Sequence, residues 1–248
     1  MAPRTQLDER FATGELDPDV WLPYYLPHWA TRAGSAATWG IGAEGLVLRI
    51  PAEQGLWAPD QHAEPLRVSG IQSGERDGQQ PFLALQQVRE PQPEFWGFTP
   101  HYGHVEVRMR MRLSPRSMAA FWLAGVERNR GESGEICVAE IFGDTITDGP
   151  SAAVGIGVKA FADPALTQDF TAVRMPLDVS VFHTYAVDWT PGALRFTVDG
   201  VEVRRLGQSP DYPVQLMLAV FDFPAKAAPG DDLEPELVVS HVRGASTR

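Results

Sequence analysis

The sequence predicts an all-β fold, a sandwich of two antiparallel sheets, on the basis of three observations. Residues 104–113 alternate apolar and polar side chains, as expected of a strand with one buried and one wet face. Residues 194–198 and 201–203 flank Asp199-Gly200, a dipeptide typical of a type I′ hairpin turn. The other apolar runs are short and punctuated by glycine and proline, and long helical periodicity is absent.

The order of segments along the chain indicates one domain. Residues 1–15 are polar, which predicts an N-terminal tail or a first edge segment, with order beginning near Leu16. Residues 17–65 contain short apolar runs such as 46–50, which predict short strands joined by long loops. Residues 70–100 are mostly polar or contain proline, and we expect a long loop region there. We see no repeat or linker, so residues 16–248 are expected to form a single domain.

Composition narrows the classes of partner. A chain of 248 residues lies within the range of a single β-sandwich domain. The formal charge of -11 argues against nucleic acid, since binding to phosphates depends on lysine and arginine. A neutral glycan fits better. The sequence has no run of about 18 apolar residues, and we expect no membrane partner.

Cysteine content and the N-terminus bear on the compartment. The single cysteine rules out an internal disulfide, so the core has to hold the fold together. The first ten residues lack the apolar segment of a signal peptide. We expect a cytoplasmic protein if Met1 is the native start, and a secreted one if a signal peptide preceded this sequence and was removed.

Residues 133–143, Ser-Gly-Glu-Ile-Cys-Val-Ala-Glu-Ile-Phe-Gly, place two glutamates in a run too apolar for a loop. Side chains alternate between the faces of a strand, so Glu135 and Cys137 share one face while Glu140 points to the other. A β-bulge at Val138-Ala139 would return Glu140 to the face of Glu135. The two Cα atoms would then lie roughly 13 Å apart. Side chains leaning inward could bring the carboxyl groups to the separation of about 5–5.5 Å found in retaining glycosidases.

The motif Glu135-Ile136-Cys137-Val138-Ala139-Glu140 resembles the signature Glu-x-Asp-x-x-Glu of glycoside hydrolase family 16, the laminarinase-like β-glucanases, with Cys137 in the place of Asp. Other segments resemble strands of this family in the expected order: Tyr102-Gly103-His104-Val105-Glu106-Val107-Arg108, Ala119-Ala120-Phe121-Trp122-Leu123, and Phe182 to Pro191 followed by Phe196 to Gly200. The N-terminal segment Trp21 to Trp29 is similar to an actinobacterial branch in which Ser-Gly-Glu-Ile-Cys-Val-Ala-Glu recurs. The resemblance spans roughly residues 100–224. It implies a concanavalin A-like jelly roll with a glycan cleft on the concave face.

The resemblance also implies roles for the two glutamates. Glu135 would be the nucleophile and Glu140 the acid/base. This chemistry needs one ionised carboxyl group that attacks the anomeric carbon and one protonated carboxyl group that releases the leaving-group oxygen. The alternative is a pair of surface carboxylates on an edge strand.

Cys137 is expected on the cleft face between the two glutamates, where family members hold an Asp that hydrogen-bonds the nucleophile. A thiol flanked by carboxylates should stay neutral, since negative neighbours raise its pKa. Cys137 is either a neutral donor in this position or a small buried hydrophobe with no catalytic part. A thiolate nucleophile is disfavoured, because no adjacent histidine or cation is visible in the sequence to activate it.

Six further residues are candidates for binding substrate. Trp122 could stack on a sugar ring or belong to the core. The aromatic and polar cluster of Tyr25, His28 and Trp29 could line sugar subsites or seal an edge of the sandwich. Lys159 could face the cleft or be solvated. Gln215 begins an alternation with Met217 and Ala219, and many family members carry Asn at the position of Ala219.

The six histidines show no metal-ligand spacing, and no phosphate-binding glycine loop is present. We therefore expect no cofactor and no catalytic metal, although the resemblance allows a structural calcium ion. The expected partner is a polysaccharide or oligosaccharide, and the chain is expected to be a monomer.

Two functions from different classes follow. The first is a retaining endo-β-glycanase, similar to endo-β-1,3(4)-glucanases, that hydrolyses a polysaccharide through a covalent glycosyl-enzyme. The second is a non-catalytic glycan-binding or sensing sandwich that lost efficient hydrolysis when Asp became Cys. The intact glutamate pair favours the enzyme.

Overall fold

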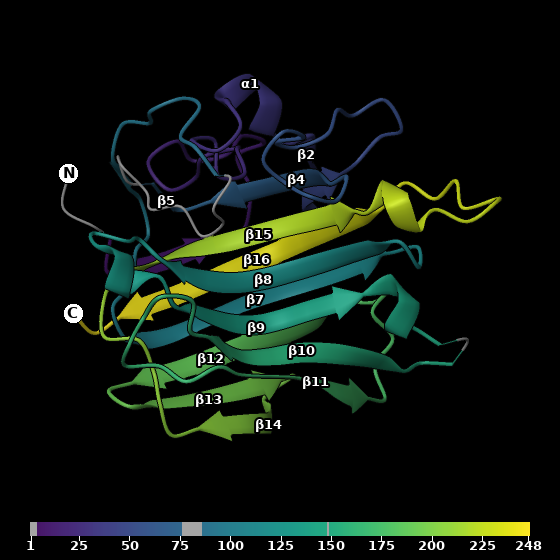
Figure 1. Ribbon diagram of the computed structural model, residues 1–248. Helices are drawn as coiled ribbons and strands as arrows, with labels where there is room; N and C mark the ends of the chain where they lie inside the picture. Colours follow the sequence, from purple (N-terminus) through teal and green to yellow (C-terminus); the bar gives the residue numbers. More distant parts are fainter. Residues whose placement is uncertain (1–3, 76–85, 148) are drawn as a thin grey trace.

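The computed structural model describes residues 4–75, 86–147 and 149–248. Two antiparallel sheets pack face to face (Figure 1), which confirms the predicted jelly-roll sandwich. The first sheet consists, in spatial order, of β14 (Val201–Leu206), β13 (Ala193–Val198), β12 (His183–Thr190), β7 (Gly103–Arg112), β16 (Glu236–Ser246), β3 (Gly45–Arg49) and β2 (Trp39–Gly42), with β1 (Gln6–Glu9) paired to β16.

The second sheet carries the candidate site. Its strands are, in spatial order, β11 (Asp169–Met175), β10 (Ala152–Lys159), β9 (Glu135–Phe142), β8 (Ser117–Gly125), β15 (Val214–Asp222) and β4 (Arg67–Gln72). A separate antiparallel pair of two-residue strands, β5 (Gly74–Glu75) and β6 (Phe95–Trp96), lies beside β15.

Helical structure is confined to short pieces. Within the described ranges there is one α-helix, α1 (Arg32–Ser35), and three 3₁₀ turns at Arg130–Glu132, Gly143–Thr145 and Pro224–Lys226. None of the described helices is long and apolar enough to cross a membrane.

The alternation in residues 104–113 and the Asp199-Gly200 turn both correspond to elements of the structure. In β7, Val105, Val107, Met109 and Met111 are buried and the intervening side chains are more exposed, as their alternation predicted. The β13–β14 hairpin turns at Asp199 and Gly200, which have φ of 50° and 77°. Positive φ at both central residues is what a type I′ turn requires.

Strands β8 and β15 are buried on both faces. In β8, Ala119, Phe121 and Leu123 point into the core between the sheets, whereas Met118, Ala120 and Trp122 belong to a second apolar cluster on the other side. β15 divides its side chains in the same way. The second cluster, which includes Trp29, Trp57 and Leu66 from the N-terminal loops, supports the wall of the cleft described below.

Ordered structure begins earlier than Leu16. Residues Gln6–Glu9 form β1, which pairs with Val242 to Ala245 of β16, and Leu7 is buried. Of the two expectations for residues 1–15, an edge segment describes this stretch. The sequence did not reveal β1 because a four-residue strand with one apolar residue shows no alternation of apolar and polar side chains.

The prediction of a long loop over residues 70–100 is wrong in part, because β4 extends to Gln72 and β5 and β6 follow within this range. Ser69 and Gln72 of β4 are buried polar residues that bond to the adjoining loops: Ser69 to the backbone of Thr38, and Gln72 to the amide of Leu26. A strand satisfied in this way needs little hydrophobicity, so its composition hides it. Residues 76–85 of the predicted loop lie outside the described residues.

Candidate active site

Strand β9 contains one extra residue at Val138. Across β8, Phe121 pairs with Ala139 and Trp122 pairs with Cys137, so Val138 has no partner of its own in that register. The pairing with β10 shifts at the same place, between Gly155 opposite Glu140 and Gly157 opposite Cys137. This is the β-bulge that the parity of the glutamates predicted.

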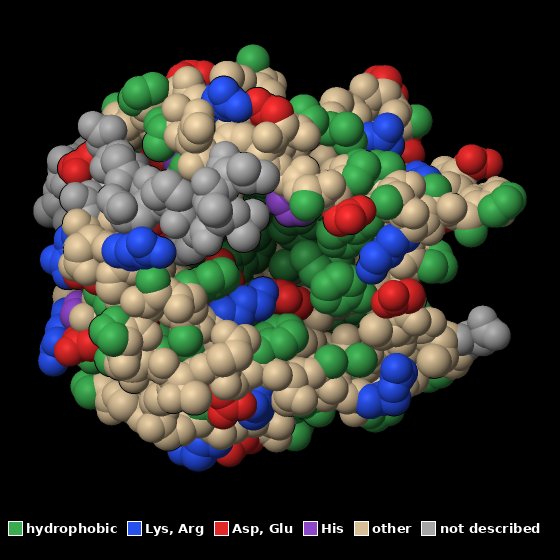
Figure 2. All heavy atoms as spheres, in the orientation of Figure 1, with side chains coloured by type: hydrophobic (Ala, Val, Ile, Leu, Met, Phe, Trp, Pro, Cys, Tyr) green, Lys and Arg blue, Asp and Glu red, His purple; other side chains and the backbone are tan. Residues whose placement is uncertain are grey.

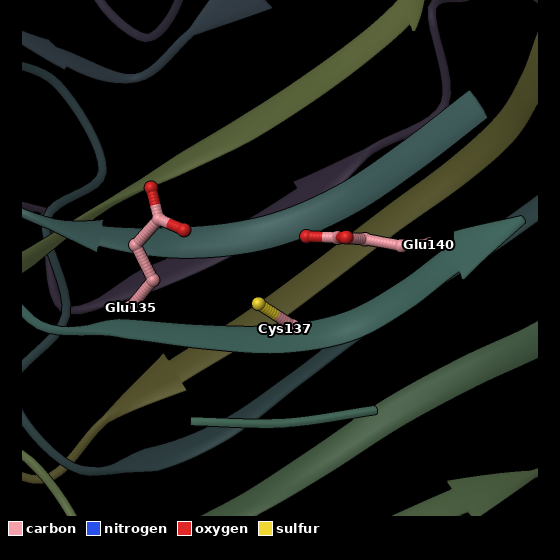
Figure 3. A group of neighbouring side chains, drawn as sticks. All are labelled: Glu135, Cys137 and Glu140. Atoms are coloured by element: carbon pink, nitrogen blue, oxygen red, sulfur yellow. The ribbon is translucent and has the colours of Figure 1, made fainter. Parts of the chain in front are cut away.

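The bulge brings the side chains of Glu135, Cys137 and Glu140 to the same side of β9. Figure 3 shows the sulfur of Cys137 between the two carboxyl groups. One donor atom from each residue lies within 4.8 Å of the others. The two carboxyl groups are therefore close enough to act on one glycosidic bond.

The floor beside Glu140 is made of residues with little or no side chain. Glu140 pairs with Ala120 of β8 and Gly155 of β10, Ala120 pairs with Ala219 of β15, and Ala219 pairs with Gly70 of β4. Ala120 lines the cavity in front of the carboxyl group, whereas the ring of Phe170 lies over Gly155 and that of Tyr25 over Gly70.

The two carboxyl groups face a cleft with a cavity of about 320 Å³. Figure 2 shows it as a hollow with hydrophobic side chains at its base and charged side chains at its margin. Glu135, Glu140 and Lys159 line the cavity together with six aromatic residues: Tyr25, Trp122, Phe142, Phe161, Phe221 and Phe223. Faces of aromatic rings suit the apolar faces of sugars as well as other apolar groups.

Lys159, the last residue of β10, stands between the two carboxyl groups. Its Nζ lies 2.6 Å from Oε1 of Glu140 and 3.8 Å from Oε2 of Glu135. The ammonium also lies 5.2 Å from the ring centre of Phe170 on β11. Of the two places proposed for Lys159, the structure shows the one facing the cleft.

The pKa of Glu135 is raised to about 7, and burial is the largest cause. The charge of Glu140 also raises the pKa, whereas Lys159 and a hydrogen bond with Trp122 lower it. Burial also acts on Lys159, where it would lower the pKa, but the charges of Glu135 and Glu140 and the hydrogen bond to Glu140 raise it above its ordinary value. The ammonium is therefore charged at the pH at which Glu135 titrates.

Cys137 is fully buried beneath the two carboxyl groups. Burial raises the pKa of its thiol well above the ordinary value, and Glu140 and Glu135 raise it further. Lys159 is the nearby cation that the sequence did not reveal, and it lowers the pKa of the thiol too little to offset the other causes. The thiol is therefore neutral, and its hydrogen bond is to Glu140.

Tyr25 and Trp122 lie close together at the cavity. The ring of Tyr25 is 6.3 Å from Trp122 and 5.5 Å edge-on from Phe221. It covers Gly70, where an added Cβ would approach the ring to 3.4 Å. Burial raises the pKa of the Tyr25 hydroxyl, and the charge of Glu135 raises it further. Tyr25 therefore lines the same cavity as the carboxyl groups, although its loop is over a hundred residues away in sequence.

The other three binding candidates lie outside the cavity lining. His28 is buried with its Nδ1 3.0 Å from Oε1 of Glu75, and Trp29 is fully buried beside it, with ring centres 4.3 Å apart. Gln215 is 2% exposed and pairs with Ala124, which also pairs with Glu135. It shares the row of the carboxyl group without lining the cavity.

Several residues that line the cavity were not among the candidates. His62 comes from a loop whose sequence carries no distinguishing signal. Phe142, Phe221 and Phe223 occur in apolar runs that look like core. The stacked pair Phe142 and Phe223, with ring centres 6.2 Å apart, lies under the ammonium of Lys226.

The spacing of Glu135, Cys137 and Glu140 would also suit a small cation. The ammonium of Lys159 already pairs with this group, so we interpret the arrangement as an ion pair and assign it no metal. The structural calcium ion allowed by the resemblance stays a prediction.

A β-sandwich with two carboxyl groups side by side in a cleft has the construction of a glycoside hydrolase. The chain belongs to family 16 of these enzymes, since the family model described as "Glycosyl hydrolases family 16" matches residues 96–229. It is 30% identical over 104 residues to a β-glucanase of Rhodothermus marinus, a match that covers 40% of this chain and 35% of that protein.

Solved structures share the fold. A GlcNAcα1-4Gal-releasing endo-β-galactosidase from Clostridium perfringens has a TM-score of 0.84 at 24% identity, covering 96% of this chain and 61% of the other. The catalytic domain of an endo-1,3-β-glucanase (laminarinase) from Thermotoga petrophila RKU-1 has a TM-score of 0.65 at 16% identity, covering 96% and 95%. The chain thus spans about a third of the β-glucanase and less than two thirds of the galactosidase.

Proposed function

We propose that this chain is a retaining endo-β-glycanase that hydrolyses O-glycosidic bonds of a polysaccharide by double displacement. The observation that supports it is the approach of the Glu135 and Glu140 side chains to within 4.8 Å in the cleft. Inverting glycosidases keep their carboxyl groups about 6.5–9.5 Å apart to admit a water molecule, which is a wider spacing than this one.

The proposed reaction has two steps. Glu135 attacks the anomeric carbon while Glu140 donates a proton to the oxygen of the leaving chain, so that one glycosidic bond breaks and a glycosyl ester forms on Glu135. Glu140 then removes a proton from water, whose oxygen attacks the anomeric carbon and releases Glu135. The neutral thiol of Cys137 is proposed to hold a hydrogen bond to Glu140 in this cycle.

The substrate is proposed to be a β-linked polysaccharide. The cleft in front of Glu140 offers room for a sugar chain, and Tyr25 and Trp122 offer rings near the carboxyl groups. Relatives named as β-glucanase, laminarinase and endo-β-galactosidase all act on β-glycans according to their names. We propose a β-1,3(4)-glucan as the first polymer to test and a galactan as the second.

Release of reducing ends from β-1,3-glucan, β-1,4-glucan, mixed-linkage glucan and galactan tests the proposal. We expect cleavage of at least one polymer by the wild type and none by Glu135→Gln. The anomer that forms first, followed by NMR, should be the β form. An initial α anomer would contradict retention, and binding of a polymer without any cleavage would favour a non-catalytic glycan-binding sandwich.

A further inference from the structure

The ammonium of Lys159 is placed unequally between the two carboxyl groups. It makes a close contact of 2.6 Å with Glu140 and lies 3.8 Å from Glu135. An ammonium at hydrogen-bonding distance stabilises an ionised carboxylate much more than one at 3.8 Å does, because it adds a charge-assisted hydrogen bond to the Coulomb attraction. The geometry therefore favours the negative charge on Glu140.

The surroundings of Glu135 act in the other direction. Burial raises its pKa to about 7, so below that pH its carboxyl group holds a proton in the free protein. The two residues lie close enough that full ionisation of both would place like charges within 4.8 Å of each other. One proton shared unequally by the pair is the expected state near neutral pH.

Few other titratable groups face this pair among the described residues. From β9 there is the neutral thiol of Cys137, from the N-terminal loop Tyr25, and from the cavity lining His62. On β11, Asp169 is occupied by an ion pair with Arg204. The cleft-facing side chains of β8 and β15 beside the pair are uncharged. Lys159 is therefore the charge that breaks the symmetry between the two glutamates.

We propose that Lys159 is a positioning residue that determines which carboxyl group of the pair holds the shared proton. The first half of the proposal is that, in the free protein, Lys159 keeps Glu140 ionised and leaves the proton on Glu135. The second half is that Lys159 has to release Glu140 before that group can act as an acid. This second half, the release of Glu140, rests on the proposed function. In that function Glu140 must be protonated and Glu135 ionised, which is the reverse of the free state.

The release has a simple physical route. A sugar hydroxyl or ring oxygen that enters the cleft beside Lys159 can accept a hydrogen bond from the ammonium and draw it from Glu140. The proton then moves from Glu135 to Glu140, because Glu140 has lost the cation that kept it ionised. No proton is gained or lost overall. The arrangement makes the catalytic protonation state depend on an occupied cleft.

The first half is tested on the free protein without substrate. Glutamate labelled with ¹³C at the carboxyl carbon allows both titrations to be followed by NMR, with Glu135→Gln and Glu140→Gln to assign the signals. In the wild type we expect Glu140 to ionise at lower pH than Glu135. In Lys159→Met that order should be lost or reversed, because the cation in contact with Glu140 is gone.

Two variants serve as matched controls. Lys159→Arg keeps the charge and should retain the wild-type order of ionisation, whereas Lys159→Gln keeps hydrogen bonding without charge and should behave like Lys159→Met. Lys226→Met makes the same change at the only other lysine, which lies over Phe142 and Phe223 rather than the carboxyl groups. It should leave both midpoints in place. An unchanged order in Lys159→Met, with the fold intact by near-UV circular dichroism, would overturn the proposal.

The second half is tested by kcat/KM against pH on whichever polymer is cleaved. The alkaline limb, which reports the acid, should move upward in Lys159→Met and stay in place in Lys159→Arg. A raised KM with unmoved limbs in Lys159→Met would mean that Lys159 only binds substrate, which contradicts this half. If no polymer is cleaved, the proposed function fails while the NMR titration still decides whether Lys159 places the proton.

Discussion

At the scale of single residues, Glu135 and Glu140 differ only in their neighbours. Glu135 follows the loop at Gly134 and is partly exposed, whereas Glu140 sits behind the bulge with Lys159 at 2.6 Å. In the proposed mechanism the same side chain serves as nucleophile at one position and as acid/base at the other, and the environment in the occupied cleft decides where the proton resides.

Removing each carboxyl group should give a different result. Glu135→Ala should abolish turnover of every substrate, because no glycosyl ester can form. Glu140→Ala should lose about 10²–10⁴ in kcat on a polysaccharide but cleave activated aryl glycosides, whose leaving group needs no proton. Rates on both substrate types measure this. The opposite pattern would exchange the two roles, and unaffected hydrolysis in both variants would exclude the site.

The residue at position 137 determines how many negative charges lie next to one another in the site with Glu135 and Glu140. In Cys137→Asp a third carboxylate would lie beside Glu135 and Glu140, and like charges raise the pKa of the acid. The alkaline limb of kcat/KM against pH should therefore move upward, by about one unit. Cys137→Ser should keep most of the activity and the wild-type profile. Superimposable profiles in all three proteins would leave Cys137 as packing only.

Glu135 should also cost the protein stability at neutral pH. Its pKa rises from an ordinary 4.5 to about 7 on folding, so the folded state binds the proton more tightly than the unfolded state does. Stability therefore falls as the pH rises from about 4.5 to 7 and is level above that.

Glu135→Gln removes this titration. Relative to wild type, the free energy of unfolding of the variant should increase between pH 4.5 and pH 7, by about 1–3 kcal/mol in total. Urea denaturation at several pH values measures the difference, with the exposed Glu53→Gln as control. A difference that is independent of pH would show that burial does not act on Glu135 as described.

At the scale of elements, the sequence predicted the features that follow from local pattern but not those that depend on tertiary contacts. The alternation of β7, the β13–β14 turn and the bulge of β9 were all visible in the sequence, because each follows from the period of a strand or the φ of a turn. β4 was not visible, because its polar residues are satisfied by loops that come from elsewhere in the chain. Phe221 and Phe223 were missed as cleft residues because β15 is apolar on both faces.

Gly157 lies opposite the bulge, in the facing strand β10, with β11 packed closely on its other side. Gly157 pairs with Cys137 at φ +148°, and a Cβ there would meet the backbone oxygen of Asp169 at 2.1 Å. Gly157→Ala should therefore destabilise the fold by about 2 kcal/mol or more. Gly207→Ala is the matched control, because a Cβ there meets nothing within 4 Å. Equal midpoints of urea denaturation in the two variants would contradict this view of Gly157.

At the scale of the whole molecule, the site depends on segments far apart in sequence. β9 and β10 supply the charged groups, while Tyr25 and His62 come from the N-terminal loops. The sequence pointed to Glu135, Glu140 and Lys159 because charge stands out in an apolar strand. It could not place Tyr25 in the cavity and His28 behind it, because that distinction arises only when the loops pack on the sheet.

Because the single cysteine is buried, the rate at which a thiol reagent labels it reports whether the sandwich is intact. Cys137 is 0% exposed. A thiol reagent such as DTNB should therefore react with the native protein at least a hundredfold more slowly than with the urea-unfolded chain, since about 3 kcal/mol of opening free energy is already a factor above 100. Stopped-flow absorbance compares the two rates. Rapid labelling of the native protein would mean that the cleft sheet opens easily.

The two-sided burial of β8 and β15 has a consequence for how this protein tolerates sequence change. A substitution at Ala119, Phe121 or Leu123 changes the packing of the core between the sheets. A substitution at the neighbouring Ala120 or Trp122 changes the packing on the cleft side. A saturation mutagenesis library sorted separately for abundance and for glycan turnover should therefore show profiles that alternate with a period of two. Variants that change substrate choice without reducing yield should be concentrated at the cleft-facing positions, so substrate range could drift while the scaffold stays the same.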